Sequence, residues 1–158
     1  MNNDTEKISE EPAAVTVLKG VIGAFLGAVP SAILWTALGK VGYIGEICGF
    51  FMIFGELYIC SLMTRKSKEM NAETATVICI AVTAVTVYVC ERAVWAWDIY
   101  DALAPGGPAL AACFLRFEEL KENMGLSADF TSELVKSYAF AAMGATTHIV
   151  KAIKFDQQ

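Results

Sequence analysis

The feature that most constrains the fold is a stretch of twenty residues, 20–39, that contains no charged side chain. After Lys40 and a short turn, residues 41–63 are nearly as apolar and are interrupted by two acids, Glu46 and Glu56. About 20 consecutive apolar residues are what an α-helix needs to cross the ~30 Å hydrocarbon core of a bilayer. The pattern therefore predicts two transmembrane helices that are joined by a tight turn.

The composition agrees with a membrane protein. The chain is 56% hydrophobic and 18% charged, whereas soluble domains are typically about 45–50% apolar and about 25% charged. Its net charge of −5 argues against a nucleic-acid partner, which would need a basic face. The five cysteines show no CxxC spacing and four lie in apolar runs, so we interpret them as buried small hydrophobic residues. We expect the lipid bilayer as a partner, and no metal or cofactor.

Two further apolar stretches complete the predicted all-α fold, an integral membrane bundle of four transmembrane helices. The last stretch is short, but its flanking Lys136 and Lys151 can extend to the two interfaces and let it span. If it does not span, the C-terminus moves to the other side. The predicted spans are residues 15–38, 42–63, 74–97 and 134–153, in a single domain of residues 14–155 that follows a flexible tail of residues 1–13.

The segment 98–133 is the only sizeable part predicted outside the membrane. It contains a short amphipathic helix at about 109–124, which we expect to lie at the interface or to cap the bundle. Its apolar residues share one arc of roughly 120° at ~100° per residue; they are Leu110, Cys113, Phe114, Phe117, Leu120 and Met124. Asp98 and Asp101 have the spacing to hold a divalent ion, although a solvated turn is the favoured interpretation.

Small residues are expected to control the packing of the first two helices, because small side chains let membrane helices approach closely. They are Gly23, Gly27 and Ser31 in the first helix and Gly42, Gly45 and Gly49 near the start of the second. The two sets are expected to face each other. Pro30 frees the carbonyl of Leu26 and should kink the first helix. Such a break can mark a transport site, although a kink that only serves helix packing is the more common interpretation.

The orientation follows from the basic residues. Arg65, Lys66 and Lys68 come directly after the second predicted span, and such clusters mark the cytoplasmic side. Tryptophans and tyrosines then fall at the outer ends of the helices, where an aromatic belt is expected. Both termini are therefore predicted to be cytoplasmic, and residues 98–133 extracytoplasmic.

The ionisable residues inside the predicted spans are the candidate functional residues, because an acid at a helix centre costs about 3 kcal/mol on translocon scales. Glu56 lies ~5 Å and His148 ~7 Å to the inner side of the midplane, so we predict that they form a buried pair. Thr146 and Thr147 are placed to complete its hydrogen bonds. The alternatives are a proton or cation relay and a protonated acid that is hydrogen-bonded to a neighbour.

A second candidate pair lies nearer the outer side. Glu46 lies ~10 Å from the midplane in that direction, and Glu91 and Arg92 lie at about the same depth in the third helix. We predict a Glu46–Arg92 pair, either as part of a relay or, as we favour, as an interfacial salt bridge.

No catalytic pattern accompanies these residues. The sequence has no GxSxG string, no glycine-rich phosphate loop, and only one histidine for a haem, so we do not expect an enzyme. Our first hypothesis is an accessory or scaffold subunit that binds a membrane partner. The alternative is a small proton- or cation-coupled carrier or channel that uses Glu56 and works as an oligomer. A carrier requires that water reaches Glu56, whereas a scaffold leaves it dry.

The string GAFLGAVPS at residues 23–31, followed by Trp35, Gly39 and GYIG at 42–45, resembles a group of small bacterial membrane proteins of uncharacterised function. Those proteins look like four-span chains with the same glycine and proline hairpin, an acid-rich outer segment and a final helix of small residues. The resemblance implies a location in the bacterial cytoplasmic membrane. It carries over no active site.

Overall fold

The computed structural model describes residues 12–40, 47–65 and 71–155, with side chains up to residue 146. Every regular element in these ranges is a helix, which confirms the all-α prediction. The helices are α1 (Ala13–Lys40), α2 (Ile47–Thr64), α3 (Ala72–Leu103), α4 (Leu110–Leu115), α5 (Phe117–Asn123) and α6 (Ser127–Phe155).

Three of the described helices, α1, α2 and α3, are long and apolar enough to cross a membrane. They correspond to the first three predicted spans, and they suit a membrane protein. The fourth predicted span, 134–153, lies within α6, which is helical over 29 residues but is not among these three. The first turns of α6 contain Asp129, Glu133 and Lys136, and these charges lower its mean hydropathy.

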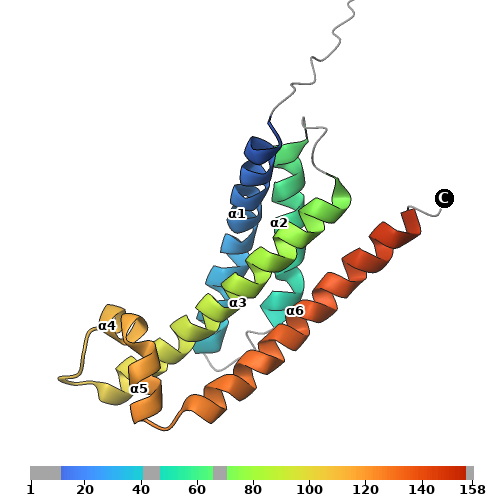
Figure 1. Ribbon diagram of the computed structural model, residues 1–158. Coiled ribbons are helices and arrows are strands. Elements are labelled where there is room, and N and C mark those ends of the chain that lie inside the picture. Colours follow the sequence, from blue (N-terminus) through green and yellow to red (C-terminus); the bar gives the residue numbers. More distant parts are fainter. Residues whose placement is uncertain (1–11, 41–46, 66–70, 156–158) are drawn as a thin grey trace, which may run out of the picture.

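The helices alternate in direction along the molecule (Figure 1). α1 and α2 lie side by side as an antiparallel hairpin, and α3 crosses them diagonally. α6 packs against α2 and α3. The N-terminal ends of α1 and α3 and the C-terminal ends of α2 and α6 lie at the upper end of the view, while α4 and α5 lie beside the far end of α3.

Local sequence explains where two of these helices begin or end. The side-chain oxygen of Asn71 accepts a hydrogen bond of 2.7 Å from the backbone N–H of Thr74, which caps the first turn of α3. α5 ends at Asn123 and is followed by Gly125, whose φ of 69° is a left-handed conformation that glycine adopts without strain. The N–H of Leu126 then bonds the carbonyl of Lys121, as in the usual glycine-terminated helix end.

The α1–α2 hairpin packs through glycine, but with different partners from those predicted. A Cβ atom on Gly27 would clash with the carbonyl oxygen of Gly55 and lie 2.6 Å from the Cα of Glu56. The expected partner Gly49 instead packs against the ring of Trp35, and Gly42 and Gly45 lie outside the described residues. The reason is the register of the hairpin. Glycines close to the turn can meet only the end of α1, whereas the middle of α1 faces the middle of α2.

α2 and α3 are also antiparallel where they meet, and the residues in contact recur every four positions along each helix. Cys60 and Cys79 lie in one buried cluster, and one helical turn further Glu56 contacts Thr83. All four side chains are buried. Residues four apart share one helix face, so the same spacing on both helices forms a continuous buried seam.

The prediction of a single amphipathic helix at 109–124 is wrong in one respect. The segment forms two short helices that are separated by Arg116. The N–H of Arg116 closes α4 by bonding Ala112, and its carbonyl accepts the first hydrogen bond of α5 from Leu120. The break lets both helices turn apolar side chains toward α3 and α6. Cys113 and Phe117 are fully buried in a cluster with Ala96, Ile99 and Phe130.

Candidate functional site

Glu56 is the most deeply buried acid in the described part of the chain, with none of its surface exposed. The hydroxyl of Thr83 donates a hydrogen bond of 2.7 Å to its Oε2 atom. Its Oε1 atom has no hydrogen-bond partner among the described residues. A buried acceptor without a partner costs about 1–3 kcal/mol. One oxygen of the carboxyl group is therefore fixed by a hydrogen bond, and the other can still take part in a hydrogen bond.

The neighbouring helices determine where this carboxyl group points. On one side, Gly27 of α1 lies against the backbone of Glu56, and no side chain fits between them. On the other side, the carboxyl group reaches Thr83 of α3. Thr83 was not predicted as the partner of Glu56. A usable signal was present, because Cys79 and Thr83 of α3 repeat the four-residue spacing of Glu56 and Cys60 of α2.

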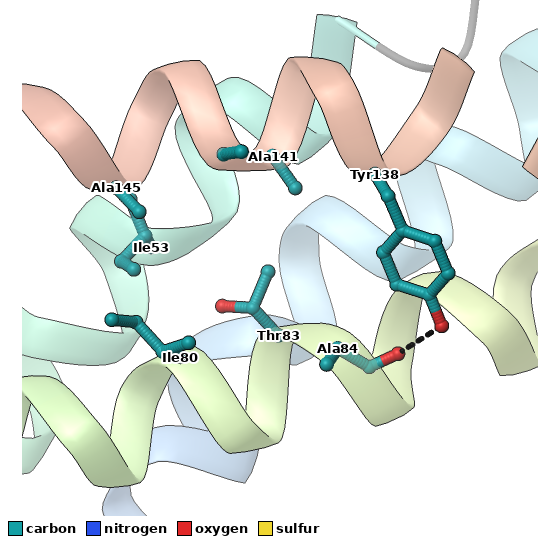
Figure 2. A pocket seen from close by; sticks show the side chains of 8 residues that line it. Ile53, Ile80, Thr83, Ala84, Tyr138, Ala141 and Ala145 are labelled. Atoms are coloured by element: carbon teal, nitrogen blue, oxygen red, sulfur yellow. Dashed lines mark hydrogen bonds between the residues drawn. The ribbon is translucent and has the colours of Figure 1, made fainter. Parts of the chain in front are cut away.

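A pocket of about 250 Å³ lies next to this pair, between α2, α3 and α6. Figure 2 shows Thr83 pointing from α3 into the space between α3 and α6. Tyr138 closes one end, where its hydroxyl donates a hydrogen bond of 3.0 Å to the carbonyl of Ala84. The pocket is lined by Ile53, Ile80, Thr83, Ala84, Tyr138, Ala141, Ala142 and Ala145. Its walls are therefore apolar except at Thr83 and Tyr138.

The predicted Glu56–His148 pair stays a prediction. His148 is a residue of α6, three positions beyond the pocket residue Ala145, but its side chain lies outside the described part. Thr146, which was expected to complete the hydrogen bonds of the pair, donates instead to the carbonyl of Met143 at 2.9 Å. The side chain of Thr147 also lies outside the description.

Glu91 occupies a different position from Glu56, nearer the C-terminal end of α3. It is 5% exposed, and the hydroxyl of Ser137 donates a hydrogen bond to its Oε1 atom. This bond joins α3 to α6. Ser137 was not a predicted site residue, since a single serine in an apolar run gives no signal of its partner.

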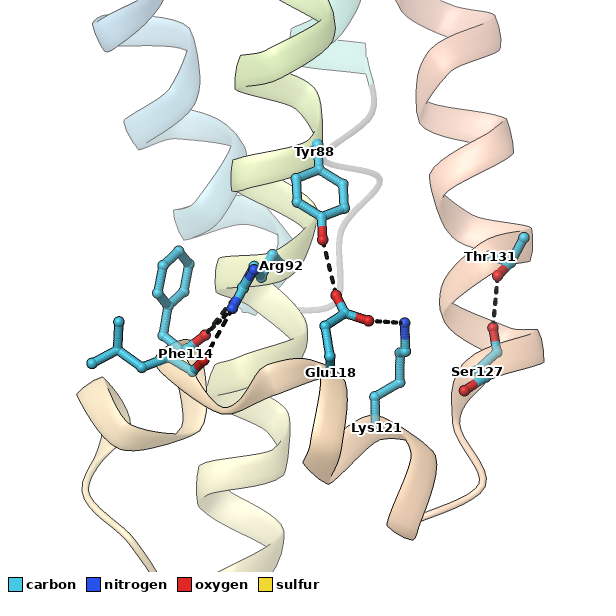
Figure 3. A network of polar contacts seen from close by, with 8 residues as sticks. Tyr88, Arg92, Phe114, Glu118, Lys121, Ser127 and Thr131 are labelled. Atoms are coloured by element: carbon cyan, nitrogen blue, oxygen red, sulfur yellow. Dashed lines mark hydrogen bonds and ion pairs between the residues drawn. The ribbon is translucent and has the colours of Figure 1, made fainter.

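Arg92 binds the C-terminal end of α4 (Figure 3). Its Nε and Nη2 atoms donate to the carbonyl of Phe114 at 3.0 and 2.7 Å, and Nη2 also donates to that of Leu115 at 3.3 Å. A cation at a helix C-terminus satisfies carbonyls that have no partner within the helix. The predicted partner Glu46 lies outside the described residues, so the Glu46–Arg92 pair is untested. In the described structure Arg92 anchors α4 to α3.

A second polar network joins α5 to α3 in the same view (Figure 3). Glu118 accepts hydrogen bonds from the hydroxyl of Tyr88 at 2.9 Å and from the ammonium of Lys121 at 2.6 Å. The Lys121 contact is the main cause that lowers the pKa of Glu118 below its ordinary value. Together with Arg92, this network fixes α4 and α5 to the end of α3.

The pair Asp98 and Asp101, considered above for a divalent ion, contacts a lysine. The ammonium of Lys40 at the end of α1 binds both carboxylates, with Asp98 at 3.3 Å. Over the described ranges, no group of three or more histidine, cysteine, aspartate or glutamate residues is arranged to hold a metal ion. The interaction joins the ends of α1 and α3.

Pro30 does not interrupt α1, which is helical from Ala13 to Lys40. Its side chain is exposed on the outside of the bundle, and it is not one of the residues that line the pocket. Pro30 thus lies on the exposed side of α1, whereas the carboxyl group of Glu56 is buried.

Comparison with known protein families, curated proteins and solved structures finds no match to this chain. The function is therefore inferred from the site itself.

Proposed function

We propose that this protein is a multi-pass membrane protein that acts as an accessory or scaffold subunit and binds a membrane-protein partner. The observation that carries the proposal is the environment of Glu56. This acid is completely buried and hydrogen-bonded to Thr83, so it joins α2 to α3 and is not in contact with water. A dry, bonded acid suits a structural role in a packed bundle better than a role in an aqueous path.

The proposal includes α6 as a fourth transmembrane helix. At ~1.5 Å per residue, its 29 residues extend over ~44 Å, which exceeds the ~30 Å of the hydrocarbon core. It packs along α2 and α3, and Lys136 lies where it can extend to an interface. With four spans both termini are cytoplasmic, and α4 and α5 lie on the outer surface as the interfacial segment. The resemblance described above favours a bacterial cytoplasmic membrane.

Cysteine labelling tests this topology. In a variant without native cysteines, Glu119→Cys should react with a membrane-impermeant maleimide in intact cells, because Glu119 is exposed on α5. Lys7→Cys should react only after the membrane is permeabilised. Labelling of a cysteine at Lys154 from outside would show that α6 does not span.

The partner-binding surface is proposed to include the outer segment, residues 98–133. This segment is held rigidly by Arg92 and Glu118, yet several of its acids are exposed, and a fixed surface suits protein recognition. The exposed acids are Asp98, Asp101, Glu118, Glu119, Glu122 and Asp129. Crosslinking in the native membrane should capture a partner with the wild type. Glu119→Lys combined with Glu122→Lys should reduce that crosslink and leave the helix content unchanged.

A small proton- or cation-coupled carrier or channel is the second candidate, and one observation favours it. Oε1 of Glu56 has no partner among the described residues, and α6 carries His148 beyond the neighbouring pocket. Proteoliposomes with an imposed pH gradient and voltage discriminate the two functions. Flux that disappears in Glu56→Gln, with the fold intact, would establish the carrier. Absence of flux from well-folded wild type would remove proton- and cation-coupled transport.

A further inference from the structure

The pocket between α2, α3 and α6 is large enough to hold a ligand group. An apolar cavity of about 150 Å³ in another protein takes up benzene, and this pocket measures about 250 Å³. It exists because the residues that α6 presents here, Ala141, Ala142 and Ala145, are too short to reach across to α3 (Figure 2). A void of this size leaves its lining without packing partners, so a fitting apolar group would gain contact energy.

The position of the pocket limits how a ligand reaches it. Ile53 belongs to α2, and Ile80, Thr83 and Ala84 belong to the first half of α3. Both helices are apolar enough to span a membrane, so the pocket lies at the depth of the hydrocarbon core. A ligand therefore enters from the lipid and must have an apolar body.

The polar residues at the pocket determine which polar group the ligand should carry in addition to its apolar body. Thr83 lines the pocket and uses its only hydroxyl hydrogen in the bond to Glu56. Glu56 does not itself line the pocket, but its carboxyl group is bonded to Thr83. Its Oε1 atom is fully buried and has no hydrogen-bond partner among the described side chains. When Glu56 is a carboxylate, the two residues thus offer acceptor oxygens and no donor. An amine complements either state of this acid, because an ammonium donates to the carboxylate and a neutral amine can take the proton of the neutral acid to form the same ion pair. A carboxylate or phosphate ligand would be repelled by the ionised acid.

We propose that the α2–α3–α6 pocket is a binding site for a lipophilic amine, with its apolar body against the alanines of α6 and its amino group at the Thr83–Glu56 pair. This site is separate from the proposed partner-binding surface, which lies on the outer segment. It also requires no water at Glu56, because the amine arrives through the lipid.

The test is equilibrium binding to the full chain in phosphatidylcholine nanodiscs, with tritiated 1-adamantylamine as the probe. The matched ligand 1-adamantanecarboxylate has the same apolar cage but an acidic group. The amine should bind saturably, while the carboxylate should only partition into lipid, as it does in protein-free nanodiscs. Glu56→Gln keeps the shape of the side chain and should weaken amine binding about tenfold, through loss of a charge-assisted hydrogen bond.

A pocket-filling variant locates the site. Ala145→Leu should abolish saturable amine binding, whereas Ala139→Leu, an exposed position on α6 outside the pocket, should not. Equal binding of amine and carboxylate would show that the pocket takes an apolar tail only, and would overturn the proposal. A disulfide-linked dimer formed by Ala142→Cys and not by wild type would place a second copy there, with the same consequence. If Ala145→Leu does not fold, the ligand comparison and Glu56→Gln still decide.

Discussion

Replacing Gly27 with alanine tests the packing on which the position of Glu56 depends. The added Cβ atom would lie 2.6 Å from both the Cα of Glu56 and the carbonyl carbon of Gly55. These are backbone atoms, so a rotamer change cannot relieve the clash and α1 must move away from α2. Overpacking of this kind costs about 1–3 kcal/mol, while alanine favours a helix over glycine by roughly 0.5–1 kcal/mol. The expected net loss of stability is about 1–2 kcal/mol.

Gly39→Ala is the matched control, because it makes the same substitution in the same helix. There the added Cβ atom meets only the side chain of Val94, at 2.9 Å from a terminal methyl group. The side chain can shift, so the helix-propensity gain should roughly offset the contact, and stability should change by less than about 1 kcal/mol. Unfolding in mixed micelles, followed by far-ultraviolet circular dichroism, measures both variants. If Gly27→Ala is as stable as Gly39→Ala, the close approach of α1 and α2 at Gly27 is refuted.

Three further predictions concern the polar contacts. Thr83→Val should destabilise the fold by about 1–3 kcal/mol, since it leaves both oxygens of Glu56 without a donor, and Thr83→Ser should recover most of the loss in the same unfolding assay. Arg92→Gln should expose the amides of α4 to hydrogen exchange and leave those of α1 protected; equal protection of α4 in both proteins would contradict its anchoring role. The lowered pKa of Glu118 in the folded state means that its stabilising effect is complete above its unfolded pKa of about 4.3 and is lost as the pH falls through the lower folded value. The protection factors of the α5 amides, which correct for the slower intrinsic exchange at low pH, should therefore fall in acid, and Glu118→Gln should remove that pH dependence.

The amide exchange experiment also separates the outer segment from the bundle. α4 and α5 are short, and isolated helices of their length are unstable in water. Their order therefore depends on the apolar cluster around Phe117 and Phe130, whose ring centroids are 4.9 Å apart, and on the polar contacts to α3. Loss of either anchor should release this segment before it affects the apolar helices.

Hydropathy alone was sufficient to predict the helical class and the positions of the three long apolar helices. The reason is physical: in lipid, a backbone can satisfy its hydrogen bonds within a helix, so a long apolar run determines the local structure by itself. The same reasoning identified Glu56 as the notable acid, since a charge in such a run is costly wherever the chain packs.

Pairing between helices could not be read from the sequence, because it depends on register and on the angle at which the helices cross. Glycines occur in both halves of the α1–α2 hairpin, yet only the fold shows that Gly27 meets Gly55 and that Gly49 meets Trp35. Likewise, the depth of Glu56 was predicted, whereas its contact with Thr83 required the register of α2 against α3.

The sequence by itself therefore determined which segments are helical and apolar, because these properties depend on neighbouring residues along the chain. Only the tertiary structure decided that residues 110–123 split at Arg116, that Arg92 binds the end of α4, and that a pocket opens beside Thr83. Each of these depends on side chains that are distant in sequence. Their interaction energies arise from contacts between helices, and a one-dimensional pattern does not record which helices touch.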